Sequence, residues 1–278
     1  MLVDFMMIGA QKCGTTSLAA QLAQHPEICF CSTKEPGFFH QHADWREQLS
    51  SYHALYAPKP GQLCGEASTM YTFLPEWRET HQRLFDYNPD LKLIYIMRNP
   101  VERVISNYTH DLVRNFVKAG PDTVVFQDPV YLNRSRYAVQ MRPYRELFGA
   151  ENILLLIFEE YVRDQACTLQ QVATFLGINP QPFVEMQAVH AHQSVGNYQL
   201  RSETARTVAR SPLFRRLRAY VPAAVRQPIR RRFSQKLDVQ PEFSSTLRRE
   251  IWRFVEDDVA QIETWLGREL TVWRQEYQ

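Results

Sequence analysis

The chain has 278 residues, 45% of them hydrophobic, and its formal net charge at pH 7 is +2. This length and composition provide for one large buried core, which excludes a disordered or fibrous chain. No apolar run approaches the roughly 18 residues of a membrane-spanning helix, and the first residues lack the basic region of a signal peptide. The cysteines are odd in number and lack a zinc-type repeat, so we expect a reducing, cytoplasmic setting.

The first predicted element is a buried strand at residues 2–8, followed by a loop with two glycines. The loop runs Gly9-Ala10-Gln11-Lys12-Cys13-Gly14, and an amphipathic helix is predicted from Thr15 onward. A strand, a glycine loop and a helix start in this order direct backbone N–H groups and the helix dipole at an anion the size of phosphate. The glycine spacing equals that of a Walker A loop, but Thr15 occupies the Walker lysine position and the lysine is Lys12. We therefore expect a phosphate site built differently from that of an ATPase or a kinase.

Two further strands are predicted at residues 28–31 and 62–66. Glu35 follows the first of them, and Glu66 ends the second. Open parallel sheets bind ligands at the carboxyl edge of their strands, so both carboxylates are candidates for that edge.

The strand predicted at residues 91–97 ends in Arg98-Asn99-Pro100. Asn99 is a favourable N-cap and Pro100 a favourable first residue for the helix predicted at 100–117. In a kinase or GTPase an equivalent strand would end in an aspartate that binds Mg²⁺, whereas an arginine presents a fixed positive fork suited to phosphate. The motif argues against a metal-dependent phosphoryl transferase and favours a nucleotide that carries an additional phosphate.

A last core strand is predicted at 153–158, and the other predicted helices lie at 15–24, 43–56, 75–87, 136–148 and 165–177. This alternation predicts the α/β class: a P-loop-like three-layer sandwich with a central parallel sheet flanked by helices.

We expect residues 1–278 to form a single domain with three parts. Residues 1–190 form the nucleotide-binding core. Residues 190–240 form a basic variable segment, since eleven Lys and Arg oppose one acid between positions 201 and 236, and this segment is either a solvated arm or a lid. Residues 241–278 contain a C-terminal helix that packs on the core through an apolar stripe made of Leu247, Ile251, Phe254, Val255, Val259, Ile262 and Leu266.

Together the motifs resemble those of sulfotransferases that use 3′-phosphoadenosine 5′-phosphosulfate (PAPS). The resemblance implies that Arg98 and Ser106 hold the 3′-phosphate. It also implies that the 5′-phosphosulfate is held by the loop residues Lys12, Cys13, Gly14, Thr15, Thr16 and Ser17. Lys34-Glu35-Pro36-Gly37-Phe38-Phe39 resembles a segment of the heparan-sulfate-type enzymes, in which the glutamate is the catalytic base. Asn133-Arg134-Ser135-Arg136-Tyr137 resembles another segment of that subgroup and adds Tyr137 to the expected nucleotide site.

In the implied reaction Lys12 stabilises the phosphate that leaves the sulfuryl group, and Glu35 removes a proton from the acceptor. No metal is required for this chemistry. Glu66 is the alternative base, or it orients other groups of the site. We expect a small-molecule or saccharide acceptor, with sugars, polyketide alcohols and other metabolites all open, and no nucleic-acid or membrane partner. The oligomeric state stays open.

Three residues near the motifs have two interpretations each. Cys13 lies at a helix start, where the pKa of a thiol can fall, but a small residue in a tight loop is the simpler interpretation. His40 and His42 follow Glu35 and either touch the acceptor or face solvent, and the second is the simpler interpretation.

Two other functions compete with sulfuryl transfer. A kinase-like phosphotransferase would need metal ligands, and no aspartate ends a strand beside the loop. A non-catalytic anion-binding or nucleic-acid-binding protein could use the basic segment, but it would leave Lys12 and Arg98 at separate strand ends unexplained. It should also carry base-stacking aromatic residues among its basic ones.

Overall fold

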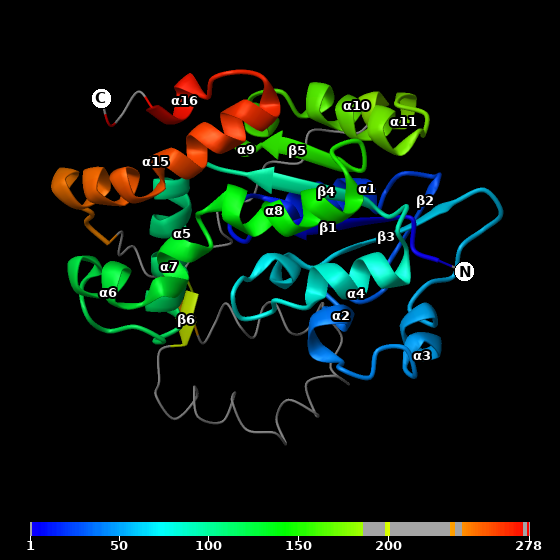
Figure 1. Cartoon of the computed structure of the whole chain (residues 1–278), viewed down its shortest axis with the longest axis horizontal. Helices are drawn as coiled ribbons and strands as arrows, with labels where there is room; N and C mark the ends of the chain where they lie inside the picture. Colours follow the sequence, from blue (N-terminus) through cyan, green and yellow to red (C-terminus); the bar gives the residue numbers. More distant parts are fainter. Residues whose placement is uncertain (1, 186–197, 201–233, 237–240, 275–276, 278) are drawn as a thin grey trace.

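A computed structural model of the chain describes residues 2–185, 198–200, 234–236, 241–274 and 277. Five parallel strands form one sheet in the order β2-β3-β1-β4-β5 (Figure 1). The strands are β1 (Phe5–Gly9), β2 (Ile28–Phe30), β3 (Leu63–Ala67), β4 (Lys92–Met97) and β5 (Ile153–Ile157). All five lie where the sequence predicts them, so the expected α/β class with a central parallel sheet is confirmed.

Helices cover both faces of this sheet. They are α1 (Thr15–Leu22), α2 (Phe38–Gln41), α3 (Leu49–His53), the 3-10 helix η1 (Thr69–Thr72), α4 (Thr80–Tyr87), α5 (Pro100–Val113), α6 (Pro121–Gln127), α7 (Pro129–Asn133), α8 (Tyr137–Phe148), α9 (Phe158–Arg163), α10 (Gln165–Leu176), α11 (Gln181–Glu185), α15 (Ser245–Leu266) and α16 (Thr271–Arg274). In Figure 1, α8 crosses in front of the sheet, whereas α1 lies behind it and packs on β1 and β3. The sheet is therefore the middle one of three layers.

The central strand explains why the first apolar run is continuous. β1 pairs with β3 on one side and β4 on the other, and Phe5, Met6, Met7 and Ile8 are all 0% exposed. A strand that is covered by helices on both faces needs apolar side chains at successive positions. The chain runs from β1 to β2 on one side and later to β4 on the other, so the point between β1 and β4 is the topological switch point where such sheets bind ligands.

Two predicted helices are shorter than expected. The helix predicted at 43–56 is reduced to α3, because residues 44–48 form turns in which the Glu47 and Gln48 N–H groups donate to the carbonyls three residues earlier. The helix predicted at 75–87 begins only at Thr80, which leaves residues 76–79 outside the helix, where their side chains line a pocket.

The C-terminal helix α15 contacts α5, α7 and α8. Its buried Asp258 accepts hydrogen bonds from the N–H groups of Ala138 (2.8 Å) and Val139 (3.0 Å), which caps the start of α8. The apolar stripe predicted for this helix is wrong at Phe254, which is 45% exposed, while Trp252 is buried in its place. Phe254 lies just past the edge of the buried face. The helical period of about 3.6 residues alone does not decide whether a side chain at that edge is buried.

β6 (Tyr198–Leu200) and β7 (Ser234–Lys236) form an antiparallel pair apart from the main sheet. The rest of the basic segment, and with it the expected arm or lid, lies outside the described residues.

Candidate active site

The phosphate loop follows β1 and is shaped by two left-handed residues, Lys12 (φ 71°) and Gly14 (φ 85°). A Cβ atom on Gly14 would lie 2.6 Å from the Phe158 ring, so only glycine fits this position. The first N–H groups of a helix have no intrahelical acceptor, and those of Thr15 and Thr16 donate to nothing in the described part of the chain. They form a cradle of free donors at a helix N-terminus, which suits a phosphate-sized anion.

The Lys12 ammonium is half-buried beside this cradle and has no hydrogen bond or ion pair with the described residues. Burial lowers the pKa of Lys12 to about 8, and the positive charge of Arg114 acts in the same direction. An unpaired, partly desolvated cation is stabilised by an anion placed next to it. The structure therefore leaves Lys12 available to a ligand in the phosphate loop.

Arg98 follows β4 and meets the phosphate loop at two side chains, the buried Tyr137 and the half-buried Phe158. The Tyr137 hydroxyl donates to the Arg98 carbonyl (2.8 Å) and lies 3.6 Å from Cys13 Sγ. The Phe158 ring that touches Gly14 also lies 5.4 Å from the Arg98 guanidinium carbon. Two predicted anion-binding motifs, almost ninety residues apart in the sequence, thus share one corner of the sheet edge.

The Arg98 side chain is partly buried and pairs with Glu102 across 3.3 Å, and Glu102 also pairs with Arg248 of α15 across 2.9 Å. Ser106 lies one helical turn beyond Glu102 on α5, so both face the same side of that helix. Its hydroxyl is half-buried and bonds to none of the described residues. The corner thus contains a guanidinium and a free hydroxyl, which are two groups that bind phosphate.

The backbone of this corner is fixed by a predicted cap and by the C-terminal segment. Asn99 Oδ1 accepts hydrogen bonds from the N–H groups of Val101 (3.0 Å) and Glu102 (3.3 Å), which confirms the predicted N-cap of α5. Glu159 binds the Asn99 N–H (2.8 Å) with one carboxylate oxygen and the indole N–H of Trp273 (2.9 Å) with the other. Both the strand end at Arg98 and the helix start at Pro100 are therefore held by buried or part-buried hydrogen bonds.

Tyr137 and Cys13, both expected in the nucleotide site, are 0% exposed and lie beneath the loop. Burial raises the pKa of the Cys13 thiol to about 11. Of the two interpretations of Cys13, a lowered thiol pKa is therefore contradicted, because desolvation dominates, and the simpler one, a small residue in a tight loop, agrees with its burial. Both side chains support the loop from below.

Glu35 lies in the loop after β2, adopts a left-handed conformation (φ 51°) and is exposed. It makes no hydrogen bond or ion pair within the described residues. The loop itself is anchored, because the Gly37 N–H donates to Ser68 Oγ beyond β3 (2.9 Å). Phe38 stacks on Tyr52 with ring centroids 4.5 Å apart. The Phe-Phe pair of the motif thus fixes the loop in the core and leaves the carboxylate free.

Glu66, the alternative base, has the opposite surroundings. It is 0% exposed, and its carboxylate accepts hydrogen bonds from the hydroxyls of Tyr71 (2.7 Å) and Ser68 (3.5 Å). Burial raises the pKa of Glu66 to about 7. Since Ser68 also binds the Gly37 N–H, Glu66 is connected to the Glu35 loop through one hydroxyl.

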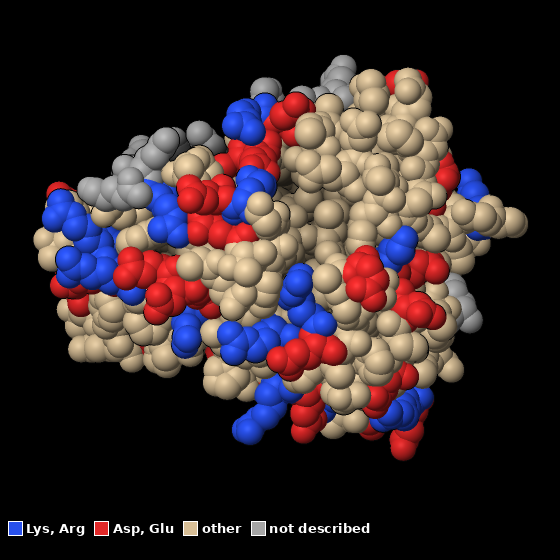
Figure 2. Space-filling view, turned by 45° about the horizontal axis from the view of Figure 1, so that its top comes forward, with Lys and Arg blue, Asp and Glu red and all other residues tan. Residues whose placement is uncertain are grey.

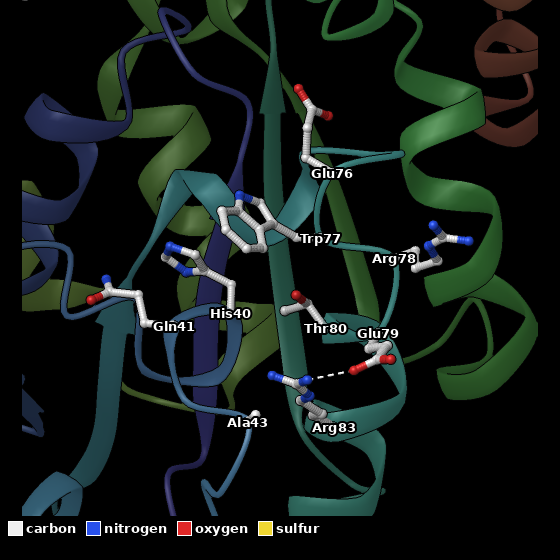
Figure 3. A pocket seen from close by; sticks show the side chains of 9 residues that line it. All are labelled: His40, Gln41, Ala43, Glu76, Trp77, Arg78, Glu79, Thr80 and Arg83. Carbon is white, nitrogen blue, oxygen red and sulfur yellow. Dashed lines mark hydrogen bonds and ion pairs between the residues drawn. The ribbon is translucent and has the colours of Figure 1, made fainter.

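A pocket of about 370 Å³ lies beside the Glu35 loop (Figure 3). Its lining residues are His40, Gln41, Ala43, Glu76, Trp77, Arg78, Glu79, Thr80 and Arg83. His40 is only 6% exposed, so the expectation that it faces solvent is wrong, and His42 is half-buried. Sequence reasoning missed this pocket, although a tryptophan between charged residues at 76–79 is a signal that could have marked it.

No group of three or more His, Cys, Asp or Glu side chains in the part of the chain that the structure describes could hold a metal ion. None of the described helices has the length and apolar character needed to cross a bilayer. On the face in Figure 2, acidic and basic side chains are interspersed, with ion pairs such as Arg268–Glu160 (2.8 Å) among the described residues.

A family model described as the sulfotransferase domain matches residues 2–216. The chain is 30% identical over 189 residues to heparan sulfate glucosamine 3-O-sulfotransferase 3B1 of Mus musculus, which covers 62% of this chain and 45% of that protein. It is 38% identical over 109 residues to the membrane-associated sulfotransferase kil1 of Dictyostelium discoideum, covering 38% of this chain and 22% of that protein. The chain thus spans less than half the length of these two relatives.

Solved structures give the same result for the fold. A crystal structure of a sulfotransferase from Alicyclobacillus acidocaldarius has a TM-score of 0.67 and 25% identity, and the match covers 99% of both chains. The mouse sulfotransferase SULT7A1 complexed with PAP has a TM-score of 0.50 and 14% identity, covering 95% of this chain and 87% of that one. The second likeness shows the fold alone.

Proposed function

Since the chain belongs to the sulfotransferase domain family, we propose that it transfers the sulfuryl group of PAPS to a hydroxyl or amine of a small-molecule or saccharide acceptor. The observation that carries this proposal is the corner shared by the phosphate loop and Arg98, joined through Tyr137 and Phe158. It offers two separate anion sites on neighbouring strands, and PAPS carries anionic groups on both its 5′ and 3′ oxygens. A saccharide acceptor is consistent with the name of the mouse relative.

Each part of the nucleotide has a group in the chain to receive it. The free N–H groups of the loop and Lys12, together with Cys13, Gly14, Thr15, Thr16 and Ser17, hold the 5′-phosphosulfate. Arg98 and Ser106 hold the 3′-phosphate. Tyr137, which contacts Cys13 and the Arg98 carbonyl, holds the phosphate loop and Arg98 in fixed positions relative to each other. In this proposal the half-buried Lys12 stabilises the charge that develops on the phosphate as it leaves, because a fixed cation accelerates the reaction most at that place.

Glu35 acts as the general base. Its exposed, unpaired carboxylate takes the proton from the acceptor oxygen or nitrogen as that atom attacks sulfur. The bond from sulfur to the acceptor forms while the bond from sulfur to the phosphate oxygen breaks, and the electron pair leaves with the phosphate. The proton ends on Glu35. Holding both reactants in line supplies much of the remaining rate enhancement. We place the reaction in the cytoplasm, which is consistent with five cysteines that form no disulfide.

A melting experiment tests the nucleotide assignment. PAP, the desulfated product, should stabilise the protein without Mg²⁺, because Lys12, Arg98 and the loop N–H groups supply the positive charge themselves. At a hundred times its dissociation constant a ligand adds roughly 2.7 kcal/mol to the free energy of unfolding, which is easily seen as a shift in melting temperature. Mg-ATP, which lacks the 3′-phosphate, should have little effect. Equal shifts with PAP and Mg-ATP, or a PAP shift that depends on Mg²⁺, would contradict the assignment.

A further inference from the structure

The pocket of Figure 3 lies between the two reacting sides of the proposed site. On one side, Gln41 Nε2 donates to the Pro36 carbonyl (3.3 Å), and Pro36 directly follows Glu35. On the other side, Glu76 pairs with Arg134 (3.5 Å), which donates to Gln11 Oε1 (3.2 Å) in the phosphate loop. A ligand in this pocket would thus have the Glu35 loop at one border and the phosphate loop at the other.

The centre of the lining is an aromatic surface next to an unpaired imidazole. Trp77 is 37% exposed, and its ring lies 5.0 Å from the His40 ring between centroids. His40 Nδ1 is buried without a hydrogen-bond partner, so Nε2 is the nitrogen that a ligand can reach. Burial lowers the pKa of His40, so the ring is neutral near pH 7 and can accept or donate one hydrogen bond to a hydroxyl.

The pocket lining contains two arginines and two glutamates, so its formal charge is zero. Arg83 pairs with Glu79 and also donates to the carbonyls of Phe39 (3.0 Å) and His42 (3.1 Å), so it is fully used by the protein. Glu76 is neutralised by Arg134. Arg78 is exposed, and in Figure 3 its guanidinium points away from Trp77 and His40. A polyanionic acceptor needs a surplus of positive charge, which this lining does not have.

From these observations we propose that the pocket binds the acceptor, and that the acceptor is an uncharged saccharide of one or two rings. One face of a sugar ring packs on Trp77, while its hydroxyls bond to His40 Nε2 and the Gln41 side chain. A hydrophobic alcohol would leave His40 Nε2 unpaired, which the burial of this side chain disfavours. A volume of about 370 Å³ lies at the lower end of the roughly 300–1,000 Å³ of small-molecule sites, which favours a short acceptor over a polymer. The inference rests on the proposed function, because it treats the Glu35 side as the acceptor side.

The test measures acceptor binding to the protein saturated with PAP. Neutral methyl hexosides and disaccharides, uronic-acid disaccharides and 2-naphthol are titrated by saturation-transfer NMR. The neutral sugars should bind, and Trp77→Ala should weaken their affinity by about tenfold, whereas Trp77→Phe keeps most of it. His40→Ala should also weaken the affinity for these sugars, because it removes the hydrogen bond from His40 Nε2 to a sugar hydroxyl. Phe254→Ala, which removes a similarly exposed aromatic ring on α15, should change nothing.

Two readouts separate this inference from the function on which it rests. The PAP melting shift reports on the nucleotide site, and its absence would remove the proposed function and the acceptor pocket together. If PAP binds but the neutral sugars do not, or if they bind equally well to Trp77→Ala, the pocket inference is wrong and the nucleotide assignment stands. Tighter binding of uronic-acid disaccharides or of 2-naphthol would also overturn it.

Discussion

The two halves of the proposed site differ in how their parts are held together. On the nucleotide half, Tyr137 and Phe158 join the phosphate loop to Arg98, and buried hydrogen bonds fix the backbone around Asn99. On the acceptor half, Glu35 is exposed and unpaired among the described residues, and His40 carries a buried nitrogen without a partner. We propose that the first half is preformed for one nucleotide, and that its loop N–H groups, Lys12 and Ser106 are the groups left open for that ligand. The second leaves polar groups open, and this is where related enzymes can differ in substrate.

The sharpest test of this contrast is Glu35→Gln, which keeps the shape of the side chain and removes its basicity. Turnover should fall by roughly 10² to 10⁴ in a radiolabelled sulfate transfer assay. PAP affinity should stay within a few-fold, because Glu35 belongs to the acceptor half. Glu47→Gln, at another exposed glutamate, is the matched control and should retain full turnover. If Glu35→Gln is near normal and Glu66→Gln is not, the roles of the two carboxylates are reversed.

The next largest expected effect is a change in the free energy of unfolding with pH, which depends on Glu66. Its pKa is raised from the ordinary 4.5 to about 7, so between these pH values the folded protein keeps a proton that the unfolded chain has released. The free energy of unfolding should therefore fall as the pH rises through this window and level off above it. The total change is about 3 kcal/mol, and urea unfolding at pH 4.5, 6 and 8 would measure it.

Glu66→Gln cannot ionise and should lose this decline, whereas Glu35→Gln should keep it. The comparison of the two variants shows whether the buried carboxylate or the exposed one controls the pH dependence. A wild-type decline that survives in Glu66→Gln would assign the titration to another group.

The smallest of the three effects concerns the nucleotide half. Arg98→Ala removes the guanidinium assigned to the 3′-phosphate, and a lost charge-assisted hydrogen bond costs roughly 1.5–3 kcal/mol. PAP affinity should therefore fall by about ten- to a hundredfold in a calorimetric titration. Adenosine 5′-phosphosulfate, which lacks the 3′-phosphate, should bind nearly as before. Arg46→Ala, at an exposed surface pair with Asp86, is the control. An equal loss for both nucleotides would place Arg98 elsewhere in the site.

The sequence alone predicts the parts of this molecule that local rules govern. Continuous apolar runs mark strands buried on both faces, and all five are found at the expected positions. The Asn99-Pro100 pair marks the start of α5, because N-cap and first-turn preferences depend on a few adjacent residues. The phosphate loop is predicted for the same reason, because its two glycines and the helix start after them are close together in the sequence.

What the sequence does not reveal depends on contacts between distant segments. The burial of His40 requires Trp77, which is nearly forty positions away in the sequence. The support of Arg98 by Tyr137 likewise joins two separate helix starts. The burial that raises the pKa of the Cys13 thiol likewise comes from residues that no local pattern identifies. The acceptor half is therefore the less predictable one, since its pocket forms from turns that only tertiary packing defines.

Glu159 accepts hydrogen bonds from both Trp273 and Asn99, and this has a consequence for how the protein folds during synthesis. When β5 leaves the ribosome, all five strands of the sheet exist, but the indole that binds Glu159 and the Asp258 carboxylate that caps α8 have not yet been synthesised. Contacts of such large sequence separation form late and slow the folding of a nascent chain. We therefore expect the nucleotide corner to be finished only after translation has passed Trp273, so that a growing chain cannot capture its donor nucleotide on the ribosome.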